Sequence, residues 1–239
     1  YQPRVMDGIY TIPACEYIEI IIQCANYTHY YSGLYYPPAV GTLNAVMRML
    51  IVRLVVYGFL CFSTLAIALF HLAQWLTSRD KLTRWMGLLS LAFALQISYP
   101  FLRMLGVPSV RPLYALEDIC GNIVLLCAIL LAGELSGRGT SWYHKFVSRP
   151  LAVGICAFSF FFPLLILPYA PFFINTYGLI LFAWELIAGL YLIFLARCIL
   201  YSDRSLGALL LFAAGIYGVA VVLSSLTANR FEPICGAWL

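Results

Sequence analysis

The feature that most constrains this fold is a series of long apolar segments without a single formally charged residue. Leu54–Leu76, Trp85–Leu102 and Ser205–Ala228 contain no Asp, Glu, Lys or Arg, and neither does the whole of 150–184. A helix needs about 20 mostly apolar residues to cross a hydrocarbon core of about 30 Å. Because segments of that length recur along the chain, the sequence predicts a helical protein that crosses a membrane several times.

The segments add up to six predicted spans. Leu113–Leu135 is a further apolar run, with acidic residues only near its ends, and two prolines and an asparagine in 168–175 divide the longest uncharged stretch in two. The predicted spans are 50–76, 85–104, 113–135, 150–167, 175–197 and 205–228. Together they form an all-α membrane bundle of six visible transmembrane helices.

Composition excludes the soluble alternatives. The chain is 63% hydrophobic and only 10% charged, whereas soluble domains contain about 45–50% apolar and about 25% charged residues. Its 14 basic and 10 acidic residues are scattered along the sequence. Nucleic-acid binding needs basic side chains clustered along a phosphate backbone, so we expect no nucleic-acid partner.

The basic residues also predict an orientation, because Lys and Arg are enriched in short cytoplasmic loops. With the N-terminus outside, eight of them lie in inner loops: Arg79, Lys81, Arg84, Arg138, Lys145, Arg149, Arg197 and Arg204. Five lie near the outer side: Arg48, Arg53, Arg103, Arg111 and Arg230. This difference favours an extracytoplasmic N-terminal segment.

Residues 1–46 differ in kind from the rest. Tyr17–Cys24 alternates, with Ile18, Ile20 and Ile22 on one face, and a period of two with β-branched residues predicts a half-buried strand. A single strand is not stable alone. We therefore expect 1–46 to be the C-terminal strands and linker of an extracytoplasmic β-domain, 47–239 to be the transmembrane region, and the chain to be a piece of a longer protein.

Several short segments resemble one family. They are the predicted strand followed by Asn26–Gly33 and Leu34–Pro38, then Ala68–Leu72 with Ser78–Asp80, and Tyr114–Glu117. In this order they are similar to the bacterial seven-transmembrane receptors with diverse intracellular signalling modules. The resemblance covers most of the chain and implies a seventh span and a signalling module, neither of which the sequence contains.

The resemblance implies a sensory receptor of the bacterial inner membrane. Its jelly-roll-like outer domain would bind a small ligand, such as a carbohydrate, and its membrane bundle would pass the bound state to a cytoplasmic signalling output. The implied partners are the lipid bilayer, that ligand and the signalling module. The resemblance is also compatible with a homodimer. Any enzyme activity would lie in the output domain, so we expect no catalytic residues in this chain.

Glu185 is the sharpest single candidate for a functional residue. It lies about ten residues into the fifth predicted helix, near the bilayer midplane, where a carboxylate costs several kcal/mol unless it is protonated, paired or hydrated. It is either a functional group or a neutral side chain that hydrogen-bonds a neighbouring helix. A functional role for Glu185 would also fit the alternative function of the chain, a secondary transporter with an intramembrane Glu.

Other polar candidates lie near the predicted span ends. At the outer end, Arg103, Glu117 and Asp118 either form an ion-pair cluster or contact lipid headgroups. At the inner end, His71 and Glu134 either form a pair that titrates near neutral pH, or the histidine hydrogen-bonds a backbone carbonyl.

The remaining motifs give little evidence of chemistry. His29, His71 and His144 are far apart in the sequence, which argues against a clustered metal site. Both lysines lie in predicted loops, so no helix offers one for a retinal Schiff base. We expect neither a metal nor a cofactor. Gly133–Gly137 has the spacing of close helix packing, but its position at a span end favours a helix stop.

Overall fold

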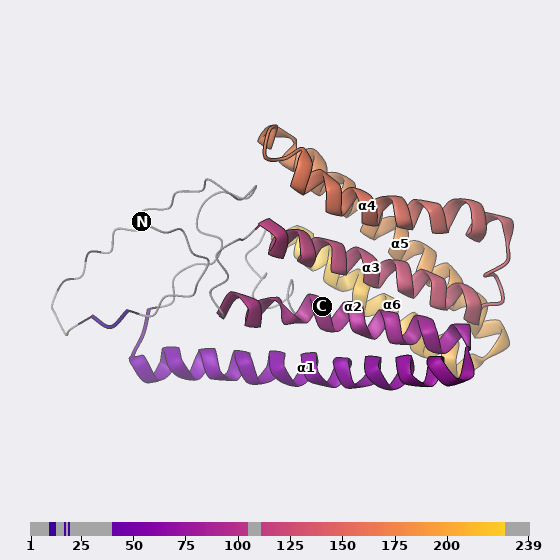
Figure 1. The fold of residues 1–239 in the computed structure, drawn as a ribbon, viewed down its shortest axis with the longest axis horizontal. Coiled ribbons are helices and arrows are strands. Elements are labelled where there is room, and N and C mark those ends of the chain that lie inside the picture. Colours follow the sequence, from indigo (N-terminus) through magenta and orange to yellow (C-terminus); the bar gives the residue numbers. More distant parts are fainter. Residues whose placement is uncertain (1–9, 13–16, 18, 20–39, 105–110, 228–239) are drawn as a thin grey trace.

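The computed structural model describes residues 10–12, 17, 19, 40–104 and 111–227. Within these ranges every regular element is helical, and no strand is present (Figure 1). The predicted all-α bundle is therefore confirmed as to fold class. The predicted strand at Tyr17–Cys24, and the β-domain to which it was assigned, lie almost wholly outside the described residues.

Six α-helices lie over the six predicted segments, with ends that differ by a few residues. They are α1 (Leu43–Ser78), α2 (Lys81–Met104), α3 (Arg111–Leu135), α4 (Arg149–Leu165), α5 (Ile174–Ser202) and α6 (Arg204–Thr227). A π-helical turn, η1 (His144–Ser148), leads into α4, and a 3-10 turn, η2 (Pro171–Phe173), leads into α5. The prolines expected to interrupt the longest apolar run do lie between α4 and α5.

Three helical segments are long and apolar enough to cross a membrane: Leu43–Ser78, His144–Leu165 and Pro171–Ser202. Shorter apolar helical stretches occur at Ile119–Leu135 and Arg204–Ile216. The described part of the chain is thus compatible with a multi-pass membrane protein.

The helix termini follow from local hydrogen bonding. Thr42 caps α1 by accepting a hydrogen bond from the Ala45 backbone N–H at 3.3 Å, and Arg79 ends the helix in the left-handed conformation at φ 54°. The carboxylates of Asp80 and Asp203 accept backbone hydrogen bonds at the starts of α2 and α6. These caps allow the chain to reverse within one or two residues.

The helices pack mainly on their sequence neighbours. α1 packs on α2, α2 on α3, and α5 on α6, while α3 also contacts both α4 and α5. The α1–α2, α3–α4 and α5–α6 junctions lie at one end of the molecule (Figure 1). We call it the basic end, because its basic residues are Arg79, Lys81, Arg84, Arg138, Lys145, Arg149, Arg197 and Arg204.

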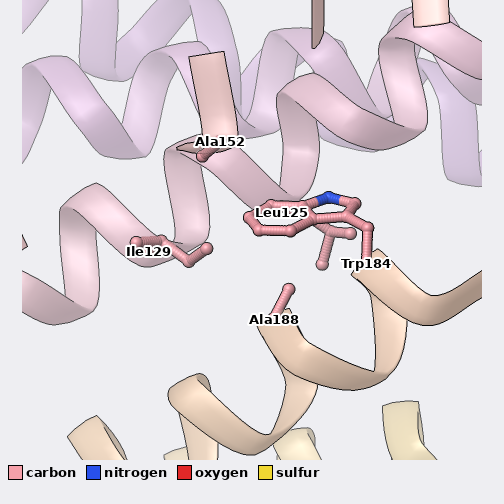
Figure 2. Packing of buried hydrophobic residues seen from close by; sticks show 5 residues of the cluster. All are labelled: Leu125, Ile129, Ala152, Trp184 and Ala188. Atoms are coloured by element: carbon pink, nitrogen blue, oxygen red, sulfur yellow. The ribbon is translucent and has the colours of Figure 1, made fainter. Parts of the chain in front are cut away.

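A tryptophan from α5 occupies the centre of the largest buried cluster. Figure 2 shows Trp184 among Leu125 and Ile129 of α3, Ala152 of α4 and Ala188 of α5. A second cluster joins α1 to α2 through Tyr57, Cys61 and Ile97. Since lipid is as apolar as these side chains, close packing rather than the hydrophobic effect stabilises such contacts in a bilayer.

Candidate functional site

The most unusual polar residue in the described part of the chain is His144. It is the first residue of η1, and only 1% of its surface is exposed. Its Nδ1 lies 3.0 Å from the hydroxyl oxygen of Tyr191, in the middle of α5. Either atom can be the donor, depending on the imidazole tautomer. This hydrogen bond joins the start of α4 to a helix that follows it in the sequence.

Gly133 provides the space for the imidazole. A Cβ added at Gly133 would lie 2.6 Å from Nε2 of His144, closer than real side chains approach. The His144 ring therefore packs directly on the backbone of the last turn of α3. A few residues later Gly137 adopts φ +66°, so the predicted helix stop in Gly133–Gly137 is confirmed. The space left by the missing side chain of Gly133 is filled by the His144 ring rather than by a closely packed helix.

Two charged side chains of opposite sign interact electrostatically with the imidazole. They are Glu134, next to Gly133 near the end of α3, and Arg149, the first residue of α4. The Glu134 carboxylate lies over Gly139, where an added Cβ would be 3.1 Å from Oε1. We call His144, Tyr191, Glu134 and Arg149 the His144 cluster.

Aromatic contacts attach the α3–α4 loop to the same side of α5. The rings of Tyr143 and Tyr191 meet edge to face, with centroids 5.8 Å apart. The Arg138 guanidinium lies 5.2 Å from the centre of the Phe194 ring, a cation–π distance. Tyr191 and Phe194 are also stacked. The loop is thus held against α5 at several points around the buried histidine.

The backbone at this site is also irregular. Residues His144–Ser148 form a π-helix, in which the Arg149 N–H bonds the carbonyl of His144. π-helical turns are rare and often occur at functional sites. The wider turn sets His144 inward while its neighbours Tyr143 and Lys145 remain exposed.

This arrangement can hold or exchange a proton, and it can distinguish two positions of α5. Imidazole and phenol both donate and accept hydrogen bonds. In a low-dielectric interior a polar network is stable only when all its members are satisfied. A displacement of α5 that breaks the His144–Tyr191 bond therefore costs about 1 kcal/mol unless a second set of partners becomes available.

The predicted site residues lie in different places. Glu134 belongs to the His144 cluster, because it interacts electrostatically with His144. His71 lies in α1, and its Nδ1 is buried with no hydrogen-bond partner among the described residues. The pairing of His71 with Glu134 stays a prediction.

Glu185 lies in α5, next to the buried Trp184, and is half-buried. It makes at least one polar or electrostatic interaction. This position beside the buried cluster is compatible with both predicted roles, a functional group or a neutral side chain that hydrogen-bonds a neighbouring helix.

The predicted outer cluster cannot be followed at the level of side chains. Arg103 lies in α2, and Glu117 and Asp118 lie in α3, but their side chains fall outside the described part of the structure. The ion-pair and headgroup hypotheses for these residues both stay predictions.

His144 and Tyr191 are the functional candidates that the sequence did not reveal. The sequence placed His144 in a loop, far from the other histidines. The one available signal was a histidine flanked by aromatic residues, directly before an apolar segment. No sequence pattern pointed to Tyr191 as its partner.

Comparison of the chain with protein-family models, with characterised proteins and with solved structures finds no match in any of the three.

Proposed function

We propose that the chain is the membrane-embedded part of a bacterial sensory receptor of the inner membrane. In this proposal all six helices cross the bilayer, residues 1–46 belong to an extracytoplasmic β-domain, and the basic end faces the cytoplasm. The bundle relays the binding of a small ligand, such as a carbohydrate, to a cytoplasmic signalling output.

The observation that carries the proposal is the His144 cluster. It joins η1 to α5 by a buried hydrogen bond, and its imidazole packs on the backbone of α3, at the end of the molecule where the basic residues gather. A receptor needs an element near the cytoplasmic side whose arrangement depends on helix position. A buried bond between Nδ1 of His144 and the hydroxyl of Tyr191 meets that requirement.

The helical connections suggest how a signal reaches the cluster. α4 and α5 are joined at the end opposite the basic end, through the turn that contains η2 (Figure 1). α4 and α5 make only a small direct contact, whereas each packs more extensively on α3. A ligand that shifts this turn would move both helices relative to α3 and would change the geometry at His144. Such a relay is a population shift between two bundle arrangements.

Topology provides the first test. Single cysteines introduced at exposed Arg48 and at exposed Arg138 would be labelled with a membrane-impermeant maleimide in intact cells, in a background without native cysteines. We expect labelling at position 48 and none at 138 until the cells are permeabilised. Labelling at position 138 in intact cells would contradict the proposed orientation.

A second experiment separates reception from transport. The protein with its whole proposed β-domain, in lipid nanodiscs, would be titrated with a panel of mono- and disaccharides while thermal unfolding is followed, and the same sugars would be offered to proteoliposomes. A sugar that raises the unfolding midpoint without accumulating in the vesicles supports a receptor. Accumulation that is lost in Glu185→Gln would instead favour the transporter.

A further inference from the structure

Exposed aromatic side chains and basic side chains are interleaved at the α3–α4 corner. Trp142, Tyr143 and Phe146 are 70%, 53% and 58% exposed. The Lys145 ammonium lies 5.3 Å from the centre of the Phe146 ring, and Trp142 contacts the same ring at a centroid distance of 6.1 Å. Large aromatic rings exposed together in this way often mark a contact surface.

The other corners of the basic end also pair basic with aromatic side chains, although Trp75 and Trp85 are half-buried. Arg84 lies 4.4 Å from the Trp85 ring centre, and Arg79 lies 5.8 Å from that of Trp75. At the α5–α6 corner Tyr201 is 80% exposed, one turn beyond Arg197. Each junction therefore presents a cation beside an aromatic ring at the end of the apolar helices.

The carboxylates at this end offset only part of the positive charge. Asp80 and Asp203 accept hydrogen bonds from the starts of α2 and α6. Glu134 lies over Gly139 and acts on His144. Eight basic residues therefore face three carboxylates, and the excess charge favours a negatively charged partner.

From these observations we propose that the basic end binds anionic phospholipid headgroups, with its main contact at the α3–α4 corner through Arg138, Trp142 and Lys145. Aromatic rings settle at the depth of the headgroups, and nearby Lys and Arg attract anionic lipids. The segment that begins at His144 continues into a helix long enough to span a bilayer, so the corner lies at headgroup depth. The inference does not depend on the receptor proposal.

The test measures lipid retention. The full chain would be reconstituted in nanodiscs with equal amounts of phosphatidylglycerol and phosphatidylcholine, extracted in mild detergent, and analysed by native mass spectrometry. We expect bound phosphatidylglycerol to exceed phosphatidylcholine. In Arg138→Gln/Lys145→Gln each lost charge should weaken phosphatidylglycerol binding roughly fivefold. Arg48→Gln, at an exposed arginine in the first turns of α1, is the matched control and should bind as the wild type does.

Two further variants and a competition with phosphate complete the test. Arg138→Lys/Lys145→Arg keeps both charges and should retain the lipid, and Lys145→Gln alone changes one exposed residue if the double variant fails to fold. Inorganic phosphate in excess should not displace the lipid. Equal retention of the two lipids, an equal loss in Arg48→Gln, or displacement by phosphate would each overturn the inference.

Discussion

Two corners of the basic end reverse the direction of the chain in different ways. Between α1 and α2 the chain reverses through Arg79 and Asp80 alone. Arg79 adopts a left-handed conformation and donates its N–H to the Trp75 carbonyl, and the Asp80 carboxylate accepts the Thr83 N–H at 3.0 Å. The hydrogen bonds described for this turn join residues at most four positions apart.

The α3–α4 corner is longer and depends on distant contacts. It includes the positive-φ Gly137, the π-helix η1 and the buried His144. The bond from His144 to Tyr191 joins residues 47 positions apart. The comparison shows that a short turn can be built by its own residues, whereas a corner that holds a buried polar group requires partners from elsewhere in the fold.

The largest expected effect comes from closing the space beside His144. In Gly133→Ala the new Cβ would overlap the imidazole, which must then move away from Tyr191. We expect a loss of about 1–3 kcal/mol in the free energy of unfolding, the usual cost of overpacking. Thermal or denaturant unfolding in detergent micelles, followed by circular dichroism, measures it.

Gly154→Ala is the matched control for that substitution. Gly154 lies inside α4, and an added Cβ would meet nothing within 4 Å. Because alanine is the better helix former, this variant should be as stable as the wild type or more so. Equal stability of the two alanine variants would show that His144 does not need the space at Gly133.

A smaller effect is expected when only the hydroxyl is removed. Tyr191→Phe keeps the ring contacts with Tyr143 and Phe194 but leaves Nδ1 of the buried His144 without this partner. The expected loss is about 1 kcal/mol, between the values found for side-chain hydrogen bonds in membranes and in soluble proteins. Tyr143→Phe, at a half-exposed ring, should change stability much less. If both variants lose the same amount, the hydroxyl of Tyr191 has no special role.

Much of the fold could be predicted because it depends on local sequence. Runs with little or no charge set the positions of the six helices, and the prolines at 168 and 171 mark the α4–α5 turn. The helix stop near Gly137 followed from the position of the glycines at the end of a predicted span. These features need only hydropathy and backbone preference, both of which are visible in one sequence.

The candidate site could not be predicted, because its members come from separate elements. Glu134 was singled out as a residue near the end of its helix, where the structure places it, but its neighbours depend on which helices pack together. The pairing of Glu134 with His71 stays a prediction, and the structure adds an electrostatic interaction between Glu134 and His144. His144 is buried only because Gly133 leaves room and Tyr191 offers a hydroxyl. Neither relation appears in hydropathy or spacing.

The smallest effect is expected at the α1–α2 corner, as a difference in pH dependence. Hydrogen bonds from the Thr83 backbone N–H and then from its hydroxyl lower the pKa of Asp80 below its ordinary 3.8. The stabilisation is therefore complete above pH 3.8 and is lost as the pH falls through the lowered pKa. Asp80→Asn still caps the helix but cannot titrate, so its unfolding midpoint should fall less than that of the wild type between pH 7 and pH 3. Asp80→Ala, which lacks the cap, should be less stable at neutral pH. An equal acid-induced fall in wild type and Asp80→Asn would mean that the charge of Asp80 adds nothing to this corner.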